Sequence, residues 1–221
     1  AGEQIAIAKT RSVVAARRVG AHLGLKAADL LLLDTLAAFT QPQDWEEGRR
    51  PIVWASNAYL MERTGFSLST LKRHARRLAE VGVITFRDSP NGKRWGRRDA
   101  DGVIVEAYGF DLAPLSARAA EFEALAADLA AERALCQRLR RQITIARRSI
   151  RARLEAALEC QEYMPGLGSL QQAFEALLTC LPGPRAGADM LQRRANRFAD
   201  LPSRVETVFL REATPVAQRT E

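Results

Sequence analysis

Two short helical segments joined by a tight turn, between Ser56 and Gly82, constrain this chain more than any other feature of its sequence. Ser56 or Asn57 can cap the first helix, because a short side-chain oxygen accepts a hydrogen bond from a free backbone N–H, and Gly65 can end it in a left-handed conformation. Ser67 can cap the second helix, whose apolar residues recur every three or four positions. This spacing predicts a helix-turn-helix. We expect its shared core to contain Leu60, Met61, Phe66, Leu71 and Leu78.

A strand-forming run follows the second helix without a linker. Val83 to Phe86 is rich in β-formers, a stretch with many Gly, Asn and Asp then contains two expected turns, and Val103 to Val105 is apolar again. A hairpin at this place makes a winged helix, so we assign residues 25–112 to a winged-helix DNA-binding domain. The domain starts with a core helix from Lys26 to Phe39, in which Asp29 suits the first turn. The apolar positions of this core helix are Leu30, Leu31, Leu33, Leu36 and Ala37.

The flanking segments make the expected fold mainly α: a winged helix-turn-helix with a long C-terminal helix and a small helical tail. Residues 1–24 form a basic N-terminal arm or helix, residues 113–160 a long helix, and residues 165–221 a small helical region that the polar end of the chain suggests is truncated. Apolar residues at every seventh position give the long helix a packing seam, which can meet the winged-helix domain or a second copy in a homodimer. The seam contains Leu115, Phe122, Leu129, Cys136, Ile143, Ile150 and Ala157.

Positive charge is concentrated in the helix-turn-helix and the hairpin. The 221 residues contain 33 Lys and Arg against 26 Asp and Glu, which gives a net charge of +7. Between Arg63 and Arg98 alone, ten basic residues face only Glu80 and Asp88, which gives a local charge of +8. A polyanion is the natural partner of such a stretch, and we expect double-stranded DNA.

The side chains expected to meet DNA lie on two elements. A helix fits the major groove, where Arg can pair with guanine and Ser or Thr can meet phosphate or a base edge, and a hairpin can reach neighbouring phosphates or the minor groove. Trp95 can instead cover the hairpin, and exposed arginines can simply form a solvated face. On the second helix the DNA-binding candidates are Ser69, Thr70, Lys72, Arg73, Arg76 and Arg77. On the hairpin they are Lys93, Arg94, Trp95, Arg97 and Arg98.

The long helix carries a second basic stretch, with no acidic residue from Arg133 to Leu154. Contact with phosphates and a solvated face that pairs with acidic residues of another copy both remain open for it. Its basic residues are Arg138, Arg140, Arg141, Arg147, Arg148, Arg151 and Arg153.

The sequence offers little for catalysis. His22 and His74 are the only histidines, and no HExxH, CxxC or paired-histidine motif is present to hold a metal. The only Gly-Lys pair, Gly92-Lys93, lacks the upstream glycine of a phosphate-binding loop. We therefore expect no enzyme activity, no catalytic residue, no metal and no cofactor.

Cysteine usage and hydropathy indicate a cytoplasmic protein. Cys136, Cys160 and Cys180 are too few and too widely spaced for a disulfide framework or a zinc site, which favours a reducing compartment. The sequence has neither a signal peptide nor a run of about 18 apolar residues, so we expect no membrane partner.

Taken together, these residues resemble the N-terminal region of RepC, the replication initiator of repABC-type plasmids of alphaproteobacteria. The resemblance runs from about Leu25 to Leu154, and more weakly to Leu210. It implies an initiator that binds the plasmid origin and recruits host replication proteins, without polymerase or nuclease chemistry, and that carries a further C-terminal domain. The motifs that carry the resemblance are Ser56-Asn57, Thr70-Leu71-Lys72-Arg73-His74, Asp88-Ser89-Pro90-Asn91-Gly92-Lys93-Arg94 and Tyr108-Gly109-Phe110-Asp111-Leu112.

Two other functions fit the same residues. A winged-helix transcriptional repressor, dimerised through the long helix, would share the DNA-binding half of this interpretation. A protein-interaction module would instead use the basic face to bind an acidic protein. A salt series with duplex DNA separates the last alternative from the others, because binding through several phosphates weakens steeply with salt.

Overall fold

The computed structural model describes the backbone of residues 2–159 and 166–212, and the side chains of residues 8–159 and 166–201. Cys160 and the last part of the expected helical tail lie outside the described residues. The fold is mainly helical with a small antiparallel sheet, as the sequence predicts. The chain divides into two compact units, Ala1–Asp128 and Leu129–Glu221, and the division falls inside the long helix.

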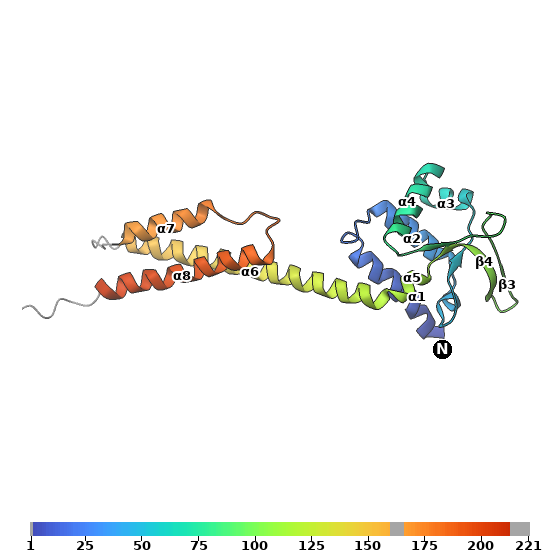
Figure 1. The fold of residues 1–221 in the computed structure, drawn as a ribbon. Coiled ribbons are helices and arrows are strands. Elements are labelled where there is room, and N and C mark those ends of the chain that lie inside the picture. Colours follow the sequence, from blue (N-terminus) through green and yellow to red (C-terminus); the bar gives the residue numbers. More distant parts are fainter. Residues whose placement is uncertain (1, 160–165, 213–221) are drawn as a thin grey trace, which may run out of the picture. The chain divides into compact units, whose positions relative to one another are not determined.

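The first unit contains most of the elements and the whole sheet (Figure 1). In chain order it comprises α1 (Gly2–Val19), α2 (Ala27–Phe39), the 3-10 helix η1 (Pro42–Trp45), β1 (Ile52–Val53), α3 (Asn57–Thr64), α4 (Leu68–Glu80), β2 (Thr85–Arg87), β3 (Trp95–Arg98), β4 (Ile104–Asp111), α5 (Ala113–Ala117) and the start of α6 (Ala119–Glu159).

The N-terminal segment is a helix that packs onto the unit. Small residues of α1 such as Ala16 are buried, and α1 lies against η1, α2 and α5. Arg11 donates hydrogen bonds to both carboxylate oxygens of Glu123 in α6, at 2.7 and 2.5 Å, and Nζ of Lys9 donates to the carbonyl oxygen of Thr40 at 2.7 Å. Of the two expectations for this segment, arm or helix, the structure shows the helix.

The caps of α3 and α4 are those that the sequence predicts. Oγ of Ser56 accepts a hydrogen bond from the backbone N–H of Tyr59 at 3.1 Å, and Oγ of Ser67 accepts one from Thr70 at 3.3 Å. Gly65 ends α3 with φ of 70°, which a residue with a Cβ adopts only with strain. Of the predicted core residues, Leu60, Leu71 and Leu78 are buried, whereas Met61 and Phe66 are partly exposed.

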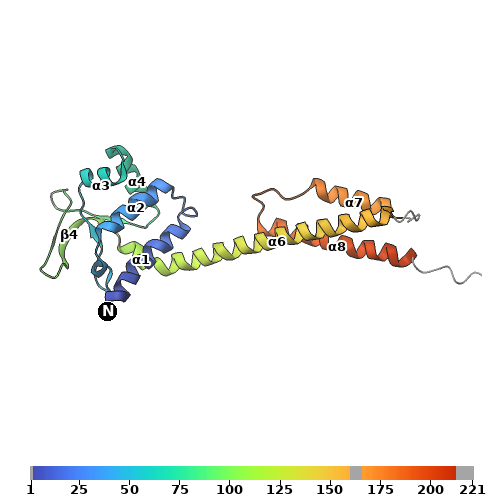
Figure 2. The same ribbon diagram turned by 180° about the vertical axis from the view of Figure 1, so that it is seen from behind.

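The buried stripe of α2 differs from the expected one. Leu31 is 43% exposed, Leu30 is partly exposed, and Leu32 is fully buried. Four consecutive leucines leave the rotation of a helix undetermined, because apolar residues then occur on every face. The neighbours decide it: α2 packs against α1, α3 and α4, and Figures 1 and 2 show α3 and α4 beside it in both views.

The sheet is built around β4. This strand pairs antiparallel with both β1 and β2, so that Phe110 is opposite Val53 on one side and Phe86 on the other. Its first half pairs antiparallel with β3, with Trp95 opposite Tyr108. The expected hairpin had two strands and one long tip, whereas the structure adds β3 and extends the last strand to Asp111. Close packing requires a glycine at position 96, because a Cβ there would lie 2.5 Å from the Trp54 ring.

The second unit comprises the rest of α6 together with α7 (Leu167–Thr179) and α8 (Ala188–Glu212), which lie along the C-terminal half of α6 in Figures 1 and 2. Seam residues such as Ile143 and Ile150 are buried in one cluster with Phe174 of α7 and Phe198 of α8. The first seam residue, Leu115, belongs to the separate helix α5. Within the described part of the chain, no helix combines the length and the apolar character needed to cross a membrane.

Candidate nucleic-acid interface

A buried polar pair sets the rotation of α4. Nδ1 of His74 lies 2.7 Å from Oδ1 of Asp29 in α2, while the other oxygen of Asp29 accepts a hydrogen bond from the backbone N–H of Lys26 at 2.7 Å. The Asp29 side chain is only 1% exposed, and the ring of Phe66 lies 5.0 Å from that of His74. With Leu71, Ala75 and Leu78 also buried, the opposite side of α4 faces solvent.

Three of the predicted cations on α4 are exposed and have no bonding partner among the described residues. Lys72, Arg73 and Arg76 have exposed side chains, and among the described residues these make no ion pair or hydrogen bond. Arg77 differs, because it donates to the carbonyl oxygen of Gly24 at 2.7 Å and lies 3.6 Å from the Asp29 carboxylate. The structure therefore places Arg77 in the contact between α4 and the α2 region, with 45% of its side chain still exposed.

The two predicted hydroxyl residues belong to the cap of α4. Oγ of Ser67 donates to Oγ1 of Thr70 at 3.0 Å and lies 3.1 Å from Oγ of Ser69. Ser69 is exposed and Thr70 is partly exposed. The first turn of α4 therefore presents a small group of hydroxyls that hydrogen-bond one another.

The basic loop, which we define as residues 89–94, connects β2 to β3. Oδ1 of Asn91 accepts a hydrogen bond from the backbone N–H of Lys93 at 3.1 Å, and Oγ of Ser89 donates to the carbonyl oxygen of Lys93 at 2.6 Å. These bonds close a turn of the kind that Asn favours. The side chains of Lys93 and of Arg97 in β3 are exposed, and within the described residues neither has an ion-pair partner.

Arg98 of the expected site is bound within the first unit. Its guanidinium donates to both carboxylate oxygens of Asp44 at 2.7 Å and to the carbonyl oxygen of Gly102 at 2.6 Å, and it lies 5.3 Å from the centre of the Trp54 ring. The side chains of Arg98 and Asp44 are 17% and 1% exposed. Arg98 therefore ties the β3–β4 hairpin to η1.

Arg94 and Trp95 are partly engaged within the protein. Arg94 donates to Oδ1 of Asn57 at the start of α3 and lies 4.6 Å from the centre of the Phe110 ring. Burial lowers the pKa of the Arg94 guanidinium from its usual value. Trp95 is 38% exposed, and its ring centre lies 5.3 Å from that of Tyr108. Arg94 thus anchors the basic loop to α3, and Trp95 covers β4.

A hollow of about 470 Å³, which we call the α4 groove, lies between α4, the basic loop and the sheet. It brings Lys72 and Arg76 of α4 together with Arg94 of the basic loop, whereas Arg73, Lys93 and Arg97 lie outside its lining. The sequence indicates Asn57 as a possible helix cap, Phe86 as part of a strand and Arg87 as part of the basic stretch, and it predicts none of the three as a DNA-binding residue. The groove is lined by Asn57, Leu71, Lys72, Ala75, Arg76, Phe86, Arg87, Asp88, Gly92, Arg94, Gly109 and Phe110.

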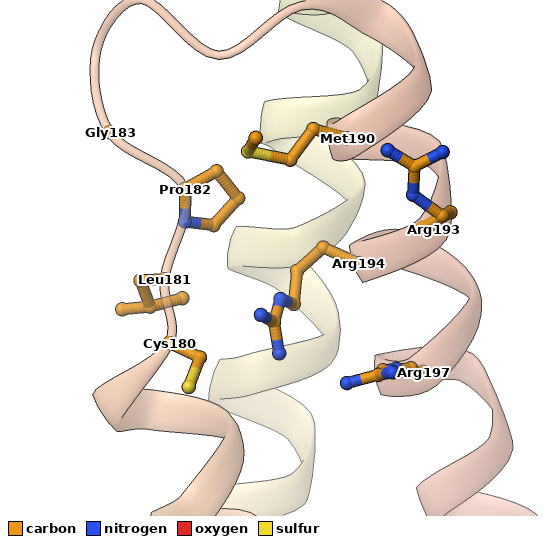
Figure 3. A pocket seen from close by; sticks show the side chains of 8 residues that line it. All are labelled: Cys180, Leu181, Pro182, Gly183, Met190, Arg193, Arg194 and Arg197. Carbon is orange, nitrogen blue, oxygen red and sulfur yellow. The ribbon is translucent and has the colours of Figure 1, made fainter.

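The second unit has an arginine-rich surface of its own. Arg140, part of the second basic stretch, donates to the carbonyl oxygens of Gly183, Pro184 and Ala186 at 3.2, 2.8 and 3.3 Å, so it holds the connection between α7 and α8. Figure 3 shows Arg194 of α8 extending toward this connection across a hollow of about 240 Å³. The hollow is lined by Cys180, Leu181, Pro182, Gly183, Met190, Arg193, Arg194 and Arg197.

The described residues contain no group of three or more His, Cys, Asp or Glu side chains that could hold a metal ion. The only histidine in the site, His74, is occupied by Asp29. The exposed guanidinium and ammonium groups of the site can bind anions.

The sequence of the chain matches one protein family. The family model described as "Replication protein C N-terminal domain" matches residues 1–158. A Sinorhizobium fredii protein named "Putative replication protein C" is 40% identical over 162 residues, which are 72% of this chain and 40% of that protein. A Rhizobium rhizogenes protein of the same name is 40% identical over 138 residues, 62% of this chain and 34% of that protein. The chain thus spans less than half the length of these curated relatives. No solved structure matches the chain.

Proposed function

The chain belongs to the replication protein C family, as its motifs led us to expect, and from this premise we propose that it is the duplex-binding part of a plasmid replication initiator. In this proposal α2, α3, α4 and the sheet form a winged helix-turn-helix that recognises an origin. The N-terminal part of α4 enters the major groove, and the β3–β4 hairpin and the basic loop form the wing. The mechanism is binding, without bond chemistry and without a cofactor.

The observation that carries the proposal is that α4 and the basic loop share one concave surface. Lys72 and Arg76 line the same groove as Gly92 and Arg94, although the two segments are separate elements. Five exposed cations that no partner within the described residues neutralises extend from this surface and its surroundings: Lys72, Arg73, Arg76, Lys93 and Arg97. A helix flanked by a basic hairpin can contact base edges and the adjoining phosphates at the same time.

The proposal gives these residues different roles. Arg73 and Arg76 would read base edges, since Arg pairs bidentately with guanine, and Lys72, Lys93 and Arg97 would bind phosphates. Arg77 and Arg98 hold α4 and the hairpin in position through Asp29 and Asp44. Ser69 and Thr70 support the start of α4, Arg94 anchors the basic loop, and Trp95 packs on Tyr108.

The repressor alternative receives less support. It requires the seam of the long helix for dimerisation, but from Leu139 to Leu154 the seam residues are buried against α7 and α8 of the same chain. Recruitment of host replication proteins remains part of the proposal for a whole initiator, because the chain spans less than half the length of its curated relatives.

A salt series with two matched variants tests the proposal. Fluorescence anisotropy with duplex fragments of the parent plasmid should show the affinity falling steeply with salt, and Arg73→Ala/Arg76→Ala should weaken binding by at least about tenfold. Arg193→Ala/Arg197→Ala removes the same charge from exposed positions of α8 and should leave binding within about twofold. Absence of binding to every fragment at low salt, or an equal loss in both variants, would overturn the proposal.

A further inference from the structure

Phe86 on β2 is an aromatic residue exposed inside a concave surface. Its side chain is 51% exposed, while Phe110, its partner across the strand pair, is 4% exposed. The two ring centres lie 5.6 Å apart. A single exposed apolar residue on a convex surface needs no explanation, but Phe86 lines the α4 groove. Phe86 therefore packs on the buried ring of Phe110 and is otherwise open to the groove.

The rest of the groove is cationic. Lys72, Arg76, Arg87 and Arg94 line it, and Asp88 is the only acidic residue in the lining. Arg94 is held in place by Asn57 and lies over Phe110, so its charge cannot swing away from the floor of the groove without breaking that bond. The exposed ring of Phe86, which we call the aromatic floor, and the surrounding cations together suit a nucleotide. A nucleotide has a flat base that stacks on a ring and a phosphate that binds cations.

We infer that the α4 groove binds an unpaired nucleotide of single-stranded DNA, with the base stacked on Phe86 and the neighbouring phosphates bound by Lys72 and Arg87. The volume of about 470 Å³ lies in the range of about 300 to 1,000 Å³ that is common for small-ligand sites. A base inside a duplex is stacked and paired on both sides and does not reach such a floor, so only an unpaired base can occupy it. The inference deepens the proposed function and rests on it.

The aromatic floor favours a nucleotide over an acidic peptide. Carboxylates of a peptide would satisfy the cations but would leave the face of Phe86 without a stacking partner. Base–aromatic stacking is tolerant of sequence, because every base has a flat face. The groove would therefore bind an unpaired base without sequence preference on the same surface that carries Lys72 and Arg76 of the proposed duplex-reading helix.

The test compares single-stranded and duplex probes on the full chain. The single strand is an oligothymidylate of about 16 nucleotides with one 2-aminopurine, whose fluorescence falls when the base stacks on an aromatic ring. The duplex probes are the parent-plasmid fragments used in the salt series. Phe86→Ala should weaken single-strand binding about tenfold and remove the quenching, whereas duplex binding should stay within about twofold. Phe86→Tyr should retain both, and Val105→Ala, at another exposed strand position, should change neither.

Other results of this experiment would contradict either the inference or the proposed function. Binding of the duplex without the single strand would overturn the inference and leave the proposed function standing, whereas binding of neither would overturn the proposed function. An equal loss of both probes in Phe86→Ala would make the ring part of the duplex surface. Displacement of the strand by polyglutamate, equally from wild type and Phe86→Ala, would make the groove a general site for acidic chains. A dimer that Phe86→Ala converts to monomers would assign the ring to a contact between copies.

Discussion

Nδ1 of His74 and Oδ1 of Asp29 lie 2.7 Å apart and join α4 to α2 across 45 positions of the sequence. Both groups are largely buried, with side chains 12% and 1% exposed. The pair decides which side of α4 faces inward, and therefore which of its cations remain free to meet an anion.

Loss of the Asp29 carboxylate should destabilise the first unit. Asp29→Asn keeps the shape of the side chain but weakens its bonds to His74, Lys26 and Arg77, so we expect the free energy of unfolding to fall by about 1 to 3 kcal/mol. Urea denaturation measures this change. Asp34→Asn in the same helix, whose ion pair with Arg17 is largely exposed, should change it by less than about 1 kcal/mol. A similar effect of both substitutions would contradict the structural role of Asp29.

Neighbouring arginines of β3 should affect different properties. Arg98→Ala leaves the buried carboxylate of Asp44 without its partner, so the free energy of unfolding should fall by about 3 kcal/mol. Arg97→Ala should leave stability within about 0.5 kcal/mol but weaken duplex binding. Urea denaturation and anisotropy on both variants check this division. Arg98→Ala with unchanged stability would show that the bond to Asp44 contributes little.

Two cations of the proposed interface should differ in their effect on specificity. Lys93→Ala should weaken binding to all sequences alike and reduce the slope of log affinity against log salt by about 0.9. Arg76→Ala should in addition relax the preference at one base position, by about 1 to 3 kcal/mol. Binding to a library of single-base variants of the site distinguishes the two. Uniform weakening by Arg76→Ala would reduce Arg76 to a phosphate contact.

The contact between α1 and α6 should weaken in acid. Hydrogen bonding and charge from Arg11 hold the pKa of Glu123 below its ordinary value of 4.5. A carboxyl group with a depressed pKa in the folded state stabilises that state above its ordinary pKa, and the contribution is lost as the pH falls through the folded value. Thermal unfolding at a series of pH values should therefore show a smaller acid-induced loss in Glu123→Gln than in wild type. Glu132→Gln, at an exposed position of α6, should behave as wild type.

Truncation of a core residue in α8 should destabilise the second unit. Phe198 is fully buried, so Phe198→Ala should cost about 3 to 5 kcal/mol. Hydrogen exchange of the full chain should show faster exchange in α6 beyond Asp128 and in α7. Met190→Ala, in the same helix but 53% exposed, should leave exchange unchanged. If Phe198→Ala left these amides protected, the cluster would not be the core of the unit.

Much of the fold could be predicted because it depends on neighbours in sequence. The caps at Ser56 and Ser67 and the left-handed end at Gly65 involve residues only a few positions apart, and the seven-residue period of the long helix is a repeat of the chain itself. The surface that buries the seam could not be predicted, because the partners in α7 and α8 are separated from it by a long stretch of sequence.

The sequence by itself determined where α3 and α4 are capped and where positive charge collects, since both depend on local hydrogen bonds and on composition. Only the tertiary structure decided which cations are free. Arg97 and Arg98 are adjacent and chemically identical, yet one is exposed and the other is bound to Asp44, 54 positions away. A buried carboxylate must find a cation to compensate for its lost hydration, and which cation it finds depends on how distant segments pack.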